Sequence, residues 1–240
     1  MKNIRFPVTS EILEKLCQKK IFFGHQSVGF NIIAGIVDIV NDYPGIPLKI
    51  LESRKINDLN KPVFAHSRIG HNTDATGKIE DFRNLISNEI GYKLEIAFLK
   101  LCYVDITAKS DIKTIFKSYQ LAMENISKSY PSLKIIHWTV PLTVSKISWK
   151  TNIKKLLGKR VWECEDNIKR NQFNTLIRKT YSGRQPVFDL AQIESQMATV
   201  RLLGELIETL RPEYTDDGGH LNIVGRRTVA EQLLLFLSTL

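Results

Sequence analysis

Apolar residues follow two different spacings along this chain. Short, nearly continuous apolar runs predict buried strands, and longer stretches with apolar residues at helical spacing predict amphipathic helices. The segment Ser53–Thr76 is polar and rich in turn residues, and no strand or helix is predicted there. The predicted strands are Lys20–Phe23, Pro47–Leu51, Leu94–Tyr103, Leu133–Trp138 and Pro186–Leu190. The predicted helices are Gln26–Asn41, Gly77–Asn88, a helix capped by Ser110, Glu165–Tyr181 and Asn222–Leu240.

Strands that alternate with helices predict an α/β fold with a mostly parallel sheet of about five strands. Right-handed crossovers make a three-layer α/β/α sandwich the simplest topology. Ligands of such sheets bind beyond the carboxyl ends of the strands. The segments that follow strands at that edge are Ser27, Tyr103–Asp105 and Trp138–Pro141.

We expect one domain over residues 1–240, because the chain shows neither internal repeats nor a low-complexity linker. The basic segment 143–163, with Trp149 and Trp162, does not fit the alternation. It predicts either a lid over the site or a solvated basic helix.

The net charge of +9 comes from lysines and arginines that are spread along the chain. This spread favours a generally basic surface over a nucleic-acid site, and no zinc-finger, RNP-like or phosphate-loop pattern occurs. Three widely separated cysteines fit a reducing compartment. No apolar stretch follows Lys2 and Arg5 before charges recur at Glu11, so we expect no secretory signal. The longest apolar run is too short to span a bilayer. We therefore expect a cytoplasmic protein with no stable membrane insertion.

A glycine-rich turn near the C-terminus carries the chemistry that points most directly to a function. Asp217 precedes His220 by three residues, so one segment can supply an imidazole base and the carboxylate that orients it. Ser27 lies between a predicted strand and a predicted helix, where its N–H and the helix dipole favour a developing oxyanion. The combination predicts acyl transfer through a serine ester. Asp216 is the alternative orienting acid.

Several short blocks resemble the SGNH (GDSL-like) hydrolase superfamily and cover nearly the whole chain. They are FFGHQSVGF, IGHNTDATGKIEDF, LKLCYVDI, HWTVPL, RNQFNTLIR, PVFDLA and DDGGHLNIVGRRTVA. The resemblance implies the flavodoxin-like SGNH fold, with Ser27 as nucleophile, His220 as base and Asp217 as its acid. It also implies an oxyanion hole that includes the Ser27 N–H and a glycine N–H, which would be that of Gly70 or Gly77.

Two blocks depart from the family pattern. The usual Gly-Asp-Ser becomes Gly24-His25-Gln26-Ser27, and Val104 stands where the family has an oxyanion-hole asparagine. Valine donates no hydrogen bond, and the loss of one such donor typically costs about 10²–10³ in rate. We expect Asn72 to act as the substitute donor, with His71 and His25 as alternatives. The residues expected to contact substrate are His25, Gln26, Tyr103 and Trp149.

We therefore predict a cofactor-independent esterase that acts on a small-molecule or carbohydrate ester, such as an O-acetylated sugar. Transfer of the acyl group to a sugar hydroxyl would use the same site. A metal site and a Cys102 nucleophile are two further alternatives, and a carbohydrate- or anion-binding module on a degenerate hydrolase scaffold is another. The histidines available to a metal are His25, His66, His71, His137 and His220.

Overall fold

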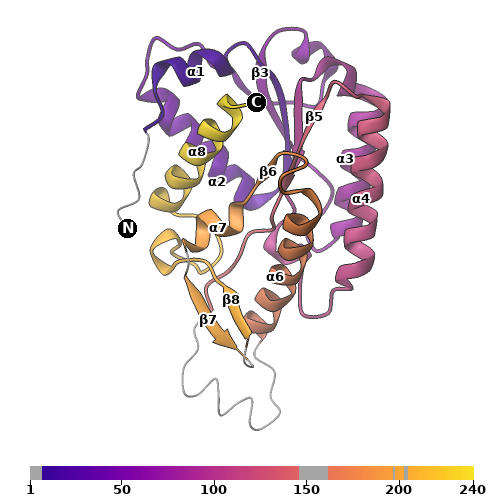
Figure 1. Ribbon diagram of the computed structural model, residues 1–240. Helices are drawn as coiled ribbons and strands as arrows, with labels where there is room; N and C mark the ends of the chain where they lie inside the picture. The colour runs from indigo at the N-terminus through magenta and orange to yellow at the C-terminus, as the bar shows by residue number, and fades with distance from the viewer. Residues whose placement is uncertain (1–6, 146–161, 197, 203–204) are drawn as a thin grey trace.

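The computed structural model describes residues 7–145, 162–196, 198–202 and 205–240 (Figure 1). Within these ranges a six-stranded parallel sheet has the order β2-β3-β1-β4-β5-β6. The strands are β1 (Lys20–His25), β2 (Ile50–Glu52), β3 (Val63–Arg68), β4 (Ile96–Leu99), β5 (Lys134–Trp138) and β6 (Val187–Phe188).

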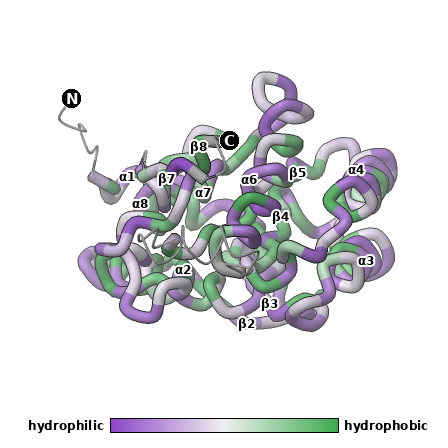
Figure 2. The backbone as a smooth tube through the Cα atoms, turned by 90° about the horizontal axis from the view of Figure 1, so that it is seen from below, coloured by the Kyte–Doolittle hydropathy of each residue, from purple (hydrophilic) through white to green (hydrophobic). Residues whose placement is uncertain are grey.

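Helices cover both faces of the sheet, so the molecule has three layers (Figures 1 and 2). One face carries α1 (Ser10–Leu16), α2 (Ser27–Asn41), α7 (Leu190–Ser195) and α8 (Ile223–Ser238). The other face carries α3 (Ala75–Leu85), α4 (Ile112–Ser129) and α6 (Trp162–Tyr181).

The central strand β1 shows why the strands read as continuous apolar runs. Phe22 packs into the core beneath α3 and α4, whereas Ile21 and Phe23 pack into the core beneath α2 and α8. All three side chains have 0% exposure. A parallel strand that is covered on both faces must be apolar at every position rather than at alternate ones.

The predicted three-layer α/β/α architecture with a mostly parallel sheet is confirmed, but one strand of this sheet was missed. The segment predicted to lack regular structure contains β3, which pairs with both β2 and β1. Its polar residues His66 and Ser67 are only 5% and 6% exposed, because β3 lies inside the sheet. Tertiary pairing thus overrides a polar local sequence, and the sheet has six strands in the described residues rather than about five.

The close packing of α2 against α8 brings an N-terminal helix beside the C-terminal helix. A Cβ on Gly35 would lie 2.4 Å from the carbonyl oxygen of Arg226, so only glycine allows this approach. Arg226 Nη2 also forms an ion pair with Asp38 of α2 at 2.8 Å. These contacts place the first turn of α8 against the middle and last part of α2.

An antiparallel hairpin of β7 (Thr199–Leu202) and β8 (Glu205–Glu208) stands apart from the main sheet, and the sequence pattern did not predict it. The predicted lid or basic helix at 143–163 lies mainly outside the described residues, which end at 145 and resume at 162. No helix in the described part of the chain is long and apolar enough to cross a bilayer.

Candidate active site

Ser27 is the first residue of α2 and follows β1 after a single residue. Gln26, the N-cap residue, donates from Nε2 to the carbonyl oxygens of Ile69 (3.2 Å) and Gly70 (2.7 Å), which fixes this tight strand-to-helix turn. The Ser27 N–H is one of the first helical N–H groups, which have no carbonyl partner within the helix. The geometry therefore places the Ser27 hydroxyl, and an N–H group without a partner inside its own helix, at the carboxyl edge of the central strand.

His220 and Asp217 form a hydrogen-bonded pair, with 2.6 Å between Nδ1 and Oδ2. The other carboxylate oxygen accepts the backbone N–H groups of Gly219 (2.9 Å) and His220 (2.8 Å). Burial raises the pKa of Asp217, but these hydrogen bonds outweigh it and hold the pKa well below its usual range. An ionised carboxylate accepts the Nδ1–H of the imidazole and so leaves Nε2 as the basic nitrogen.

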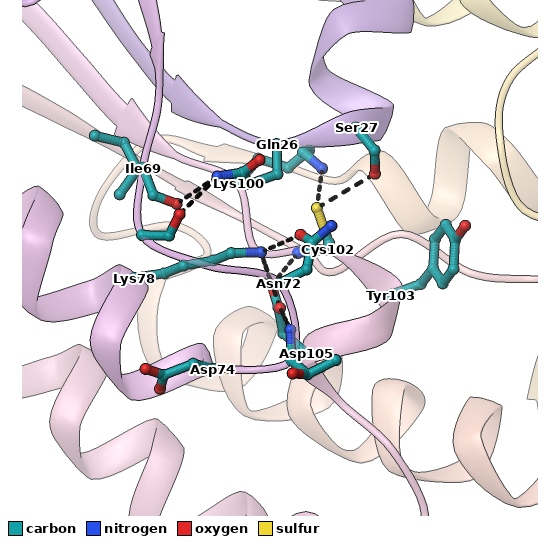
Figure 3. A network of polar contacts seen from close by, with 12 residues as sticks. Gln26, Ser27, Ile69, Asn72, Asp74, Lys78, Lys100, Cys102, Tyr103 and Asp105 are labelled. Atoms are coloured by element: carbon teal, nitrogen blue, oxygen red, sulfur yellow. Dashed lines mark hydrogen bonds and ion pairs between the residues drawn. The ribbon is translucent and has the colours of Figure 1, made fainter.

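Contacts to two other elements bring this pair to the start of α2. Asn31 Oδ1, one turn beyond Ser27, accepts the N–H of Leu221 at 3.3 Å. The short 3₁₀ turn η4 (Tyr103–Asp105) spans the remaining gap. Tyr103 Oη lies 3.4 Å from His220 Nε2. Cys102 Sγ lies 3.8 Å from Ser27 Oγ (Figure 3).

In these contacts the Ser27 hydroxyl and the His220 imidazole each bond to another residue, as in an enzyme without substrate. In the hydrogen bonds of the described residues, Ser27 Oγ pairs with Cys102 and His220 Nε2 pairs with Tyr103. Burial raises the pKa of Tyr103, and the nearby Asp217 raises it further, so the phenol keeps its proton and can donate it to Nε2. Catalytic hydrogen bonds are often loose in unliganded enzymes and tighten when substrate binds.

Gly70 does not present a free N–H, contrary to the oxyanion role expected for it. Its φ angle is +55°, and its N–H donates to Asp81 Oδ2 at 2.7 Å. The N–H of Gly77 is likewise engaged by Asp74 Oδ1 at 2.8 Å. Carboxylate acceptors form strong hydrogen bonds with N–H donors, so neither glycine offers an available donor in this arrangement.

Asn72 is exposed, and its Oδ1 accepts a hydrogen bond from Lys78 Nζ at 2.8 Å. Lys78 in turn contacts Asp105, whose carboxylate accepts the N–H of Cys102 at 2.6 Å. Asn72 is therefore connected to the segment that touches Ser27 through two buried charged side chains (Figure 3).

Of the four residues expected to contact substrate, only Tyr103 lies beside the Asp217–His220 pair in the described residues. His25 is 1% exposed and its Nε2 lies 3.0 Å from His66 Nδ1, so it faces the core rather than a ligand. Gln26 uses its amide to hold the strand-to-helix turn. Tyr103 lies beside His220, whereas Trp149 lies outside the described residues.

Sequence reasoning missed two buried lysines near the site. Lys100 is 0% exposed and its Nζ lies 3.3 Å from Cys102 Sγ. The sequence did indicate the burial of Lys100, because it is the one charged residue between Ile96 and Val104 in a predicted strand that is nearly all apolar. Lys78 gave no such signal, since a lysine in a helical pattern is normally solvated. Cys102 is buried among these groups and remains an alternative nucleophile.

A cavity of about 680 Å³ lies beside the Asp217 turn. Arg170 is 3% exposed at this cavity and packs over the ring of Tyr103, with 5.6 Å from its Cζ to the ring centroid. Burial lowers the pKa of Arg170 to about 10, which leaves it charged at neutral pH. Hydroxyl and carboxylate groups also line the cavity, from Thr73, Thr107, Thr143, Asp166, Thr215, Asp216 and Asp217.

The histidines considered as metal ligands do not form one cluster, and each described contact joins at most two of them. His25 pairs with His66, His137 contacts Tyr119, and His220 contacts Asp217. The described residues contain no group of three or more His, Cys, Asp or Glu side chains placed to hold a metal ion.

Comparison with known proteins identifies the fold. No family model matches the sequence, and no curated protein matches it. Among solved structures, an acetyl esterase crystallised with an acetate ion aligns over 91% of this chain and 95% of its own, with 16% identity and a TM-score of 0.52. A lipase/acylhydrolase from Enterococcus faecalis aligns over 92% and 96%, with 12% identity and a TM-score of 0.52. A carbohydrate esterase family 3 structure from Talaromyces cellulolyticus aligns over 91% and 95%, with 15% identity and a TM-score of 0.51. The chain therefore has the fold found in these esterases and acylhydrolases.

Proposed function

We propose that the protein is a serine ester hydrolase of the SGNH type, with Ser27 as nucleophile, His220 as general base and Asp217 as the orienting acid. One observation carries the proposal, namely the 2.6 Å hydrogen bond between Asp217 and His220 in a turn whose next residue, Leu221, contacts Asn31, one helical turn beyond Ser27. A paired carboxylate and imidazole next to a helix N-terminal serine are the groups that acyl transfer requires.

The reaction proceeds in two steps. His220 Nε2 leaves Tyr103 and takes the proton of Ser27 Oγ as this oxygen attacks the ester carbonyl carbon. The tetrahedral intermediate expels the alcohol, which receives the proton from His220, and an acyl-serine remains. Water then attacks the acyl-serine, His220 accepts a proton from it and returns the proton to Ser27, and the free acid departs.

The oxyanion of each tetrahedral intermediate requires N–H donors. The Ser27 N–H at the start of α2 is the first, supported by the helix dipole. The Asn72 amide is the second, because it is exposed and lies on the loop linked to Cys102. Gly70 is left out of this proposal, since its N–H is directed at Asp81.

The substrate we propose is a short acyl ester of a small molecule or carbohydrate. The side chains of His220 and Asp217 are 42% and 58% exposed, so the site is open enough for a bulky alcohol part. Two structures with this fold are named an acetyl esterase and a carbohydrate esterase, which supports this substrate class. The cavity beside Asp217 has hydroxyl and carboxylate groups in its lining, which would suit a polyhydroxylated group.

A fluorophosphonate probe followed by peptide mapping tests the proposal directly. We expect one modified residue, Ser27, together with hydrolysis of an aryl acetate that the Ser27→Ala variant lacks. A Cys102→Ala variant should keep both properties, which separates the serine from the cysteine nucleophile. Labelling at another residue, or the absence of turnover on aryl acetates and acetylated sugars, would contradict the proposal.

A further inference from the structure

A completely buried ion pair lies beneath the proposed oxyanion site. Lys78 of α3 contacts both carboxylate oxygens of Asp105 in η4, at 2.9 Å and 2.7 Å. The two side chains are 1% and 0% exposed. Desolvation of two charges offsets much of their attraction, so a buried pair is weak evidence for stability and calls for another role.

The third contact of Lys78 fixes the orientation of an exposed amide. Lys78 Nζ lies 2.8 Å from Asn72 Oδ1. An ammonium group can only donate hydrogen bonds, so the oxygen of the Asn72 amide must face Lys78. The NH₂ group of Asn72 then points away from the ion pair, toward the surface where a ligand oxygen can accept from it.

Asp105 holds the same loop through the backbone. Its Oδ1 accepts the N–H of Thr73 at 2.9 Å, next to Asn72 in the chain. Thr73 has a φ angle of +72°, which is a strained conformation for a β-branched residue. Such strain persists only where surrounding contacts impose it, and it is concentrated at functional sites.

The ion pair also connects Asn72 to the nucleophile. Asp105 Oδ2 accepts the N–H of Cys102 at 2.6 Å, and Cys102 Sγ lies 3.8 Å from Ser27 Oγ. In Figure 3 the group of Lys78, Asn72 and Asp105 lies on one side of Cys102, with Ser27 on the other. One carboxylate thus sets the position of the Asn72 loop relative to the residue in contact with Ser27.

We propose that Lys78 and Asp105 are positioning residues that hold the Asn72 amide as the oxyanion donor, in place of the asparagine that Val104 replaces. The inference rests on the proposed ester hydrolysis and specifies how its transition state is stabilised. Neither charged side chain touches substrate, and both act through Asn72.

The first test replaces Asn72 alone. Asn72→Ala should lower kcat for p-nitrophenyl acetate by about 10²-fold, with KM changed less than about threefold, because the donor acts in the transition state. Asn72→Asp keeps the contact with Lys78 but replaces the NH₂ donor with a carboxylate oxygen. Its kcat should fall at least as far, while its Tm stays at or above the wild-type value.

The second test removes the ion pair. In Lys78→Met/Asp105→Asn no unpaired charge is left buried, and kcat should fall by roughly 10–10²-fold because Asn72 loses its orientation. Adding Asn72→Ala to this pair should bring the total loss only to the level of Asn72→Ala alone, about 10²-fold, since both changes remove the same donor and their effects are not additive. Ile79→Val on the same helix is the control, and it should lower Tm slightly without changing kcat.

The outcomes separate the inference from the proposed function. If Ser27→Ala abolishes turnover but both Asn72 variants retain kcat within about threefold, the inference is wrong and the proposed function stands. If the wild-type protein shows neither turnover nor labelling of Ser27, both are wrong. Should the ion-pair variant fail to fold, the Asn72 variants still decide, because Asn72 is exposed.

Discussion

The two halves of the proposed site are built in opposite ways. The acid–base half comes from one turn, in which Asp217 and His220 are three residues apart and 58% and 42% exposed. The oxyanion half comes from two distant segments joined by Lys78 and Asp105, which are almost fully buried. The exposed half owes its geometry to local hydrogen bonds, whereas the buried half owes its geometry to the ion pair that joins α3 to η4. Changes in the first half should therefore affect chemistry alone, and changes in the second should affect chemistry and stability together.

The largest expected effect comes from Ser27, at which the two halves meet. Ser27→Ala should lower kcat for an aryl acetate by about 10⁴-fold or more, and combining it with His220→Ala should add little, because the residues act as a unit. Steady-state kinetics at saturating substrate measure the loss. Ser10→Ala at the start of α1 is the control and should have wild-type kinetics. A residual kcat within tenfold of wild type would rule out Ser27 as the nucleophile.

Asp217 and Asp216 offer a matched pair within the exposed half. Asp217→Asn should lower kcat by about 10²–10⁴-fold, because an amide cannot hold the Nδ1–H tautomer of His220. Asp216→Asn should change kcat by less than about threefold, since Asp216 contacts Asn222 rather than the imidazole. Tm should hardly change in either variant. Equal losses, or a larger loss from the Asp216 change, would assign the orienting role differently.

Tyr103 tests whether the resting contact competes with catalysis. Tyr103→Phe keeps the ring that packs under Arg170 but removes the hydroxyl that lies 3.4 Å from His220 Nε2. Because one hydrogen bond contributes about 0.5–1.5 kcal/mol, kcat/KM should rise by about two- to tenfold. A fall in kcat/KM would show that the hydroxyl assists the imidazole instead.

Buried histidines should make the protein sensitive to acid. Burial lowers the pKa of His25 to about 2, with Lys100 and His66 adding to the effect, and burial lowers the pKa of His137 to about 4. Below the ordinary value of 6.5 the unfolded chain binds protons that the folded protein does not. The free energy of unfolding should fall with decreasing pH below that value, by up to about 1.4 kcal/mol per pH unit for each histidine. Urea unfolding between pH 7 and pH 4 measures this slope, and a flat profile would contradict it.

Glu194 should have the opposite effect at higher pH. Burial raises its pKa to about 8, although the Leu142 N–H and the charges of Lys100 and Arg170 oppose the shift. Between 4.5 and about 8 the folded protein retains a proton that the unfolded chain has lost. Stability is therefore lost as pH rises through this range, with a slope of at most about 1.4 kcal/mol per pH unit.

Glu194→Gln isolates that contribution. Glutamine can still accept the Leu142 N–H, but it has no proton to lose, so the variant should gain stability relative to wild type between pH 5 and pH 8. Below pH 6.5 its stability should fall more steeply than that of wild type, because in wild type the Glu194 contribution partly offsets that of the histidines down to pH 4.5. Urea unfolding at pH 5 and pH 8 measures both, and a variant that gains nothing at pH 8 would contradict the prediction.

The same difference explains which parts of the proposed site could be predicted from the sequence and which could not. The proposed triad of Ser27, Asp217 and His220 could be put forward from the sequence because each residue lies in a short segment with its own signal, either a strand-to-helix turn or an acid three residues before a base. The role of Gly70 was misjudged because its partner, Asp81, is eleven residues away and reaches it only through the geometry of α3. His25 was expected to face substrate, and only its pairing with His66 of β3 shows that it faces the core.

By itself the sequence determined the alternation of strands and helices, the three-layer architecture and the segments that carry the proposed triad, because apolar spacing and local turns act over a few residues. The tertiary structure alone decided that Val63–Arg68 is a strand inside the sheet, that Lys78 and Lys100 are buried, and that Asn72 is fixed by an ion pair. The pairing of β3 with β1 and the ion pair between Lys78 and Asp105 join residues 43 and 27 positions apart. A buried charge is stable only where folding supplies its partner.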